Sequence, residues 1–235
     1  MTTIAIESVK HSPGVTTAAV AMAAAYGEGA VVVEADPSGG DIAARSRLAL
    51  EPGLLTLAAA GRRVGTALDF SPHLQRLPGG GGAVVAPVDP DQATAAIATT
   101  APRLAAAHGA QLTIVDCGRI FAASAARPAI RSSDVAVVVL EPTVAGVEHL
   151  RARVGSLDRP VLGRLVALLV GDRPYGANEV ARAVGIPVVG ALAVDPRAVA
   201  ALYAGSAARR SLLVRSARTA LDAIAEIAAP AEVLA

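Results

Sequence analysis

The sequence predicts an α/β fold, in which helices cover both faces of a mostly parallel, twisted sheet and so form three layers. Short hydrophobic segments alternate with helix-like segments along all 235 residues, as in proteins built from parallel strands and crossover helices. The hydrophobic segments are continuous apolar runs, which is typical of parallel strands buried on both faces. Hydrophobic residues make up 53% of the chain and aromatic residues only 2%, so we expect an aliphatic core.

The elements follow one another in a regular order. Strands are expected where Val, Ile, Leu and Ala run together, at Thr3–Ser8, Ala30–Glu34, Ala83–Ala86, Leu112–Val115, Val135–Leu140, Val166–Val170 and Val188–Ala191. Helices are expected between and after them, at Thr16–Tyr26, Ile42–Arg47, Gly53–Ala60, Pro90–His108, Gly146–Val154, Ala177–Val184, Pro196–Ala204 and Ser211–Ile227. No internal repeat or linker divides the chain, so we expect residues 1–235 to form a single domain.

Charge and cysteine content restrict the class of protein. The formal net charge is +1, so the molecule as a whole has no electrostatic preference for nucleic acid. The single cysteine, Cys117, excludes an internal disulfide and fits a reducing compartment, so we expect a cytoplasmic protein. Met1 leads into the first strand without the features of a signal peptide. Every apolar run is interrupted before about 20 residues, so no membrane span is expected.

The only lysine of the chain, Lys10, follows the first expected strand. It opens the segment Lys10-His11-Ser12-Pro13-Gly14-Val15-Thr16-Thr17, which leads into an alanine-rich helix. Backbone N–H groups at a helix N-terminus bind phosphate, and the usual loop is G-x-x-x-x-G-K-[ST]. Here Gly14 allows a close approach, Thr16 supplies a hydroxyl for Mg²⁺, and Val15 stands in the place of the lysine. The alternative is an ordinary turn between strand and helix, capped by Ser12.

Acidic residues follow the second expected strand, in the segment Glu34-Ala-Asp36-Pro-Ser-Gly-Gly-Asp41. The carboxyl ends of parallel strands face the ligand crevice, and Glu34 and Asp36, two residues apart, are expected on one side of the strand end. The alternative is an Asp-Pro turn in which Asp41 caps the next helix, and we expect only that role for Asp41.

A third candidate segment is Leu112-Thr-Ile-Val-Asp116-Cys-Gly118. A hydrophobic strand that ends in Asp, with Gly two residues later, has the form of a Walker B segment, in which the Asp holds Mg²⁺ through water. The alternative is a strand-ending Asp in a turn, which is common for any one such residue. The order and spacing of the three segments together favour a nucleotide site.

These segments resemble the ParA/MinD group of P-loop ATPases, also called deviant Walker A proteins. The family's loop, K-G-G-V-G-K-T-[TS], aligns without a gap with Lys10–Thr17. Its D-x-D-P segment is similar to Glu34–Pro37, and Asp116 falls at the Walker B aspartate. The resemblance continues over nearly the whole chain, at Gly82–Pro87, Leu140–Glu148, Gly185–Gly190, Val194–Val199 and Gly205. The loop most resembles the atypical, TadZ-like members that are associated with Tad-type pilus localisation.

The resemblance implies a P-loop NTPase fold, ATP and Mg²⁺ as cofactors, and a role for each matching residue. The nucleotide-binding loop is Lys10, His11, Ser12, Pro13, Gly14, Val15, Thr16 and Thr17. Lys10 matches the signature lysine that reaches the phosphates of a partner subunit in a dimer, and Asp36 matches the carboxylate that positions the attacking water. Thr16 and Asp116, the latter through water, match the Mg²⁺ ligands.

The chain departs from the family pattern at three places. Val15 replaces the lysine that binds phosphate within its own subunit, a contact worth about 1.5–3 kcal/mol. Pro13 removes one backbone N–H from the loop. Gly171-Asp172-Arg173 lacks the asparagine of the adenine-side segment.

Two functions follow from this pattern. The first is a cytoplasmic, dimerising positioning factor with weak ATPase activity, whose cargo is DNA in partition or a polar pilus or secretion machine. The alternative, favoured by Val15, is a catalytically inactive pseudo-ATPase scaffold that binds a protein partner without turnover.

Two features of the C-terminal part indicate whether the chain contacts DNA or a membrane. ParA-like proteins use basic residues of this part for nonspecific DNA contact, and the candidates here are Arg209, Arg210, Arg215 and Arg218. A solvated helix face in an arginine-rich chain is the favoured interpretation. The segment Ile227–Ala235 has no basic residue and contains Pro230, so no direct membrane anchor is expected.

Overall fold

The computed structural model describes residues 2–10, 14–63, 67–155, 159–205 and 210–228. Within these residues, eight strands form one sheet in the order β3-β4-β2-β5-β1-β6-β7-β8, and every neighbouring pair is parallel except β3 and β4. The strands are β1 (Thr2–Ser8), β2 (Ala30–Glu34), β3 (Gln75–Arg76), β4 (Gly82–Val84), β5 (Leu112–Arg119), β6 (Val135–Leu140), β7 (Leu165–Val170) and β8 (Val188–Leu192).

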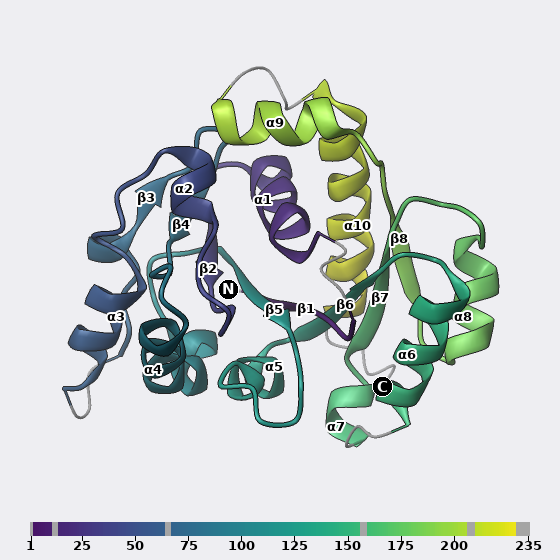
Figure 1. The fold of residues 1–235 in the computed structure, drawn as a ribbon, viewed down its shortest axis with the longest axis horizontal. Helices are drawn as coiled ribbons and strands as arrows, with labels where there is room; N and C mark the ends of the chain where they lie inside the picture. Colours follow the sequence, from purple (N-terminus) through teal and green to yellow (C-terminus); the bar gives the residue numbers. More distant parts are fainter. Residues whose placement is uncertain (1, 11–13, 64–66, 156–158, 206–209, 229–235) are drawn as a thin grey trace, which may run out of the picture.

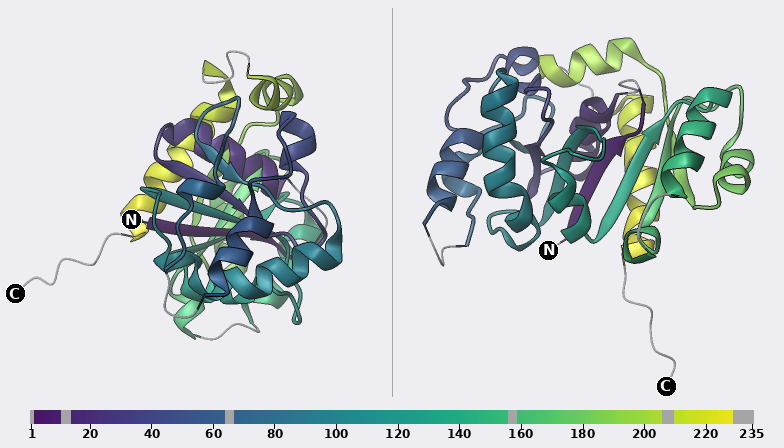
Figure 2. Two further views of the ribbon diagram at one scale, coloured as in Figure 1. Left: turned by 90° about the vertical axis from the view of Figure 1, so that its left-hand side faces the viewer. Right: turned by 60° about the horizontal axis from the view of Figure 1, so that its bottom comes forward.

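Helices cover both faces of this sheet, so the expected three layers are confirmed (Figure 1). They are α1 (Val15–Tyr26), α2 (Ile42–Ser46), α3 (Leu54–Gly61), α4 (Pro90–Thr100), α5 (Arg127–Ser132), α6 (Val144–Val154), α7 (Arg159–Leu162), α8 (Ala177–Val184), α9 (Pro196–Ala204) and α10 (Leu212–Ala228), with the 3₁₀ turns η1 (Ser71–His73) and η2 (Ala101–Ala106). Helices α1, α9 and α10 lie on one face, and α3 to α6 lie on the other (Figure 2).

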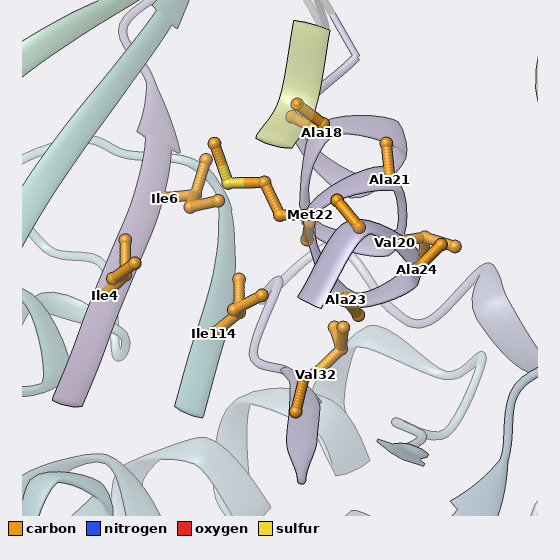
Figure 3. Close-up of a cluster of buried hydrophobic side chains, with 14 of the residues drawn as sticks. Ile4, Ile6, Ala18, Val20, Ala21, Met22, Ala23, Ala24, Val32 and Ile114 are labelled. Atoms are coloured by element: carbon orange, nitrogen blue, oxygen red, sulfur yellow. The ribbon is translucent and has the colours of Figure 1, made fainter. Parts of the chain in front are cut away.

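The hydrophobic core is divided by the alternation of side chains along each strand. On β1, Ile4 and Ile6 face α1, whereas Ala5, between them, faces the opposite helical layer. Figure 3 shows the α1 side, where Met22 of α1 points toward Ile6 and Ile114, and Ala23 lies next to Val32. The small side chains of α1 let this helix lie close to the sheet, which brings its N-terminus to the carboxyl ends of the central strands.

The order of strands creates a crevice. From β1 the chain passes to β2 on one side of the sheet, and after β5 it crosses to β6 on the other side of β1. Such a switch point leaves a crevice at the carboxyl ends of the central strands, where ligands of open α/β sheets bind.

Most expected elements are confirmed, four of them with identical bounds: β2, β6, α8 and α9. The helix expected over Pro90–His108 is wrong in its second half, because the α-helix ends at Thr100 and η2 continues as a 3₁₀ helix around Pro102. Proline cannot donate the hydrogen bond that an α-helix needs there. The edge strand β3 and the short helices α5 and α7 were missed, since segments of two to six residues carry little periodicity.

No helix among the described residues combines the length and the apolar composition that a membrane crossing requires.

Candidate functional site

A cleft of about 210 Å³ lies where the N-terminus of α1 meets the carboxyl ends of β1, β2 and β5. The sequence segments at Gly14–Thr17, Asp36 and Gly118 all contribute to it, as expected from their places after parallel strands. The described residues that line it are Ser8, Gly14, Val15, Thr16, Thr17, Asp36, Asp41, Arg45, Gly118 and Arg119.

The first N–H groups of α1 have no hydrogen-bond partner among the described residues. Its N-cap residue, Gly14, adopts φ 98° and ψ 35° and offers no side-chain cap, and the first turn has no acidic residue. The first backbone bond of the helix runs from the Ala18 N–H to the Gly14 carbonyl at 2.8 Å, so the preceding N–H groups have no partner within the helix. This is the arrangement that binds anions. His11, Ser12, Pro13 and the expected Ser12 cap lie outside the described residues.

Val15 brings no charge to this helix end. Its side chain is 5% exposed and belongs to the core between α1 and the sheet.

Asp116 lies fully buried beneath the start of α1. Its Oδ1 accepts a hydrogen bond from the Gly118 N–H at 3.1 Å, but Oδ2 is buried and has no hydrogen-bond partner among the described residues. Burial raises the pKa of Asp116 to about 7; the Thr16 hydroxyl and the Gly118 N–H act to lower this pKa, while the nearby Glu34 and Asp36 carboxylates add to the increase. A cation at this place would relieve both the missing partner and the repulsion.

Asp36 lies close to Gly118 at the mouth of the cleft. Its Oδ1 accepts a hydrogen bond from the Ser38 N–H at 2.8 Å, and burial raises its pKa. Gly118 has φ 59°, and a Cβ at this residue would overlap the Asp36 carboxyl. The glycine after the Walker B-like aspartate therefore gives Asp36 the room to lie in the cleft.

Glu34 has a structural role that the sequence did not reveal. Its Oε1 accepts hydrogen bonds from the N–H groups of Asp41 and Ile42 at 2.6 and 2.9 Å, and Oε2 accepts one from the Ala86 N–H at 2.9 Å. The expectation that Asp41 caps α2 is wrong, because the Asp41 side chain makes no cap bond and the buried Glu34 carboxylate already holds those donors. Glu34 thus ties β2 to the start of α2 and to the end of β4.

Lys10 lies at a separate hollow of about 110 Å³, which it lines with Val9, Glu141, Thr143 and His149, among others. It is not among the described residues that line the cleft at α1. Within one chain, the structure therefore brings Thr16, Asp36 and Asp116 together but leaves Lys10 at the neighbouring strand end.

Two arginines of the cleft were not singled out from the sequence. Arg45 comes from α2 and Arg119 from the end of β5. The sequence contains no signal for Arg45, because its place depends on how α2 packs against α9, far along the chain.

One arginine of the predicted C-terminal cluster already has a partner within the chain, and the others differ in what the structure describes of them. Arg218 donates a hydrogen bond to the Ala25 carbonyl and so holds the end of α1. Arg210, Arg215 and Arg218 are all exposed, and Arg209 lies outside the described residues.

The cleft fits Mg²⁺ bound together with a phosphate. Among the described residues there is no group of three or more His, Cys, Asp or Glu that would hold a metal alone. Mg²⁺ usually takes one or two carboxylates and completes its octahedron with water and phosphate oxygens. The orphaned Asp116 oxygen beside the Thr16 side chain supplies that kind of donor set.

Glu7 is a buried carboxyl on the opposite face of the sheet. Neither of its oxygens has a hydrogen-bond partner among the described residues, and Arg153 lies 3.9 Å away. Burial raises the pKa of Glu7 to about 7, against the lowering effect of Arg153 and Arg127. Between the ordinary pKa of 4.5 and about 7, the folded chain thus binds a proton that the unfolded chain releases.

The difference in proton binding between the folded and unfolded chain makes the free energy of unfolding depend on pH. We expect the free energy of unfolding to fall as the pH rises from 5 to 8, and Glu7→Gln to reduce that slope by up to about 1 kcal/mol per pH unit. Urea denaturation at four pH values would measure it. Glu28→Gln is the matched control, since the Glu28 side chain is 80% exposed. Equal slopes for wild type and Glu7→Gln would contradict the prediction.

Together, the glycine-led helix N-terminus, the buried carboxylate beneath it and the switch point of a parallel sheet define the site class: a candidate nucleoside-phosphate site in a P-loop-type fold. No family model matches the chain, and no curated protein matches it.

Several solved structures share this fold. The MinD cell-division ATPase of Pyrococcus furiosus aligns with 96% of this chain and 99% of its own at 16% identity and a TM-score of 0.76. The MinD of Pyrococcus horikoshii, complexed with Mg-ADP, aligns with 97% and 98% at 16% identity and a TM-score of 0.72. A ParA family ATPase from Chlorobium tepidum aligns with 94% and 98% at 16% identity and a TM-score of 0.67. The chain has the fold of MinD and ParA proteins, and the predicted fold class is confirmed.

Proposed function

We propose that this chain is a ParA/MinD-like protein, acting as a single domain, that binds ATP with Mg²⁺ and dimerises around the nucleotide to position a cargo. One observation carries the proposal: the N-terminus of α1, whose N-cap Gly14 has no capping side chain, lies beside Asp116, whose second carboxylate oxygen is buried without a partner among the described residues. The shared fold and the Mg-ADP of the Pyrococcus horikoshii MinD support it.

The residues that match the family pattern have the following roles in this proposal. The loop Lys10–Thr17 holds the phosphates with its backbone N–H groups, and Thr16 and Asp116, the latter through water, hold Mg²⁺. When bound, the cation neutralises charge on the phosphate oxygens. Asp36 positions the attacking water.

Lys10 acts on the nucleotide of a second copy of the chain. Its place in a separate hollow, beside Glu141 and His149, supports a role outside its own cleft. The cargo is DNA or a polar pilus or secretion machine in the cytoplasm, reached through a protein partner or through the exposed Arg210 and Arg215.

A second function, that of a pseudo-ATPase scaffold, rests on Val15. Its buried side chain leaves the start of α1 without the usual cation. Such a protein would keep the dimer surface and bind its partner without turnover. Phosphate release measured alongside nucleotide binding separates the two functions: binding without release identifies the scaffold.

The proposed dimerisation around the nucleotide can be tested in solution. Calorimetry with Mg-ATP, combined with light scattering, should show binding and a shift from monomer to dimer in the wild type, and Lys10→Ala should abolish the shift. Arg76→Ala is a matched control, because Arg76 is an exposed cation whose ion pair with Glu28 lies outside the cleft. If millimolar Mg-ATP neither binds nor changes the mass of the wild type, the proposed function is wrong.

A further inference from the structure

A nucleotide in this cleft lies close to several carboxyl groups. Asp36 and Asp41 line the cleft, and the buried Asp116 lies at its base. A nucleoside triphosphate adds several further negative charges, and like charges a few ångströms apart repel strongly in a partly buried site. The chain has no lysine besides Lys10, which lies at the neighbouring hollow. A cation other than a lysine must therefore offset the charge of the phosphates.

Among the described residues, the cations that line the cleft are Arg45 and Arg119. Both side chains are exposed, so either is accessible to an anion. Arg45 differs from Arg119 in being held in place by an aromatic ring.

The ring belongs to Tyr203 of α9. The Arg45 guanidinium carbon lies 3.8 Å from the centre of this ring, a stacking contact that suits the planar guanidinium. Tyr203 itself is 6% exposed. Burial raises the pKa of its hydroxyl to about 12, against the lowering effect of Arg45 and of the nearby Thr17 side chain. The ring therefore lies between the start of α1 and Arg45.

The stacked guanidinium has its donors available. No ion pair or side-chain hydrogen bond between described residues includes Arg45. Stacking uses the face of the guanidinium and leaves its N–H groups at the edge, where they match phosphate oxygens in a bidentate manner. The ring also reduces the rotamer entropy that binding would otherwise cost.

We propose that Arg45, positioned by the Tyr203 ring, is the cation that binds a phosphate of the nucleotide within the same subunit, in the role that Val15 leaves vacant. The inference rests on the proposed nucleotide-binding function and adds a residue to that site. Arg45 reaches the cleft from α2, whereas a loop lysine would reach it from the start of α1.

The test is the affinity for Mg-ATP measured by calorimetry. Arg45→Gln should raise the Kd about ten- to hundredfold, as expected for the loss of a charge-assisted phosphate contact. Arg47→Gln is the matched control: Arg47 is exposed at the end of the same short helix, carries the same charge and does not line the cleft. We expect its Kd to stay within about twofold of the wild type, because exposed charges outside the cleft are screened by salt.

The role of the ring is tested separately. Tyr203→Phe keeps the stacking surface and should retain wild-type affinity, whereas Tyr203→Leu removes it and should raise the Kd. Thermal melting of each variant shows that it is folded. A Kd that rises equally in Tyr203→Phe and Tyr203→Leu would contradict a positioning role for the ring.

The outcomes separate this inference from the proposed function. If the wild type binds Mg-ATP and Arg45→Gln binds it equally well, the inference is wrong and the proposed function stands. The same holds if Arg45→Gln and Arg47→Gln lose affinity equally, or if only Arg119→Gln loses it. If the wild type binds no nucleotide, both are wrong. A loss confined to Arg45→Gln and Tyr203→Leu supports the inference.

Discussion

Gly118→Ala should lower the free energy of unfolding by about 2–5 kcal/mol and abolish binding of Mg-ATP at millimolar concentration. Gly118 has φ 59°, a left-handed conformation that costs a residue with a Cβ about 1–2 kcal/mol. The added Cβ would also overlap the Asp36 carboxyl, and overpacking of this kind costs about 1–3 kcal/mol. Because β5 and the segment after β2 are both held by backbone bonds, such as that from the Ala35 N–H to the Asp116 carbonyl at 2.7 Å, Asp36 is the part that moves.

Urea denaturation and calorimetry measure the two effects. Gly185→Ala is the control for backbone conformation alone, because Gly185 has φ 74° and nothing lies within 4 Å of the position of its Cβ. It should cost about 1–2 kcal/mol and leave nucleotide binding intact. If Gly118→Ala kept full affinity for Mg-ATP, nucleotide binding would not depend on the present position of the Asp36 carboxyl.

Phe70→Ala should lower the free energy of unfolding by about 3–5 kcal/mol. Phe70 is fully buried in the core on the α3–α4 face of the sheet, and its N–H donates a hydrogen bond to the His108 carbonyl at 2.9 Å. The loss combines the transfer free energy of the ring with the cost of the cavity that it leaves, because a packed core relaxes only in part. A loss of this size is a large part of the total stability of an ordinary domain, about 5–15 kcal/mol.

The second phenylalanine provides the comparison. Phe121 is 56% exposed, so Phe121→Ala should change the unfolding free energy by no more than about 0.5 kcal/mol. Chemical denaturation of both variants at one pH measures the difference. A loss for Phe70→Ala of no more than about 0.5 kcal/mol, as expected for a surface position, would contradict the prediction.

The position of the candidate site was predictable because it lies at strand ends. Asp36 and Asp116 each follow a strongly hydrophobic run, and carboxyl ends of parallel strands share one edge of the sheet. The helix that begins near Thr16 was predictable from its alanine content and the preceding glycine. The cap of α2 was not, since nothing in the sequence shows that Glu34 reaches three backbone donors from two other segments.

Local pattern thus determined the α/β class, the approximate bounds of most long elements and the place of Asp36 after β2, because periodicity and turn residues act over a few positions. The strand expected to end at Val115 continues to Arg119, so Asp116 lies within β5, paired with Glu34 at the end of β2. Tertiary structure alone decided which side chains share a space. It placed Lys10 beside Glu141 and not in the cleft, and it stacked Arg45 on Tyr203 across 158 positions of the chain. Such contacts depend on how helices pack over the sheet, and no short stretch of sequence contains that information.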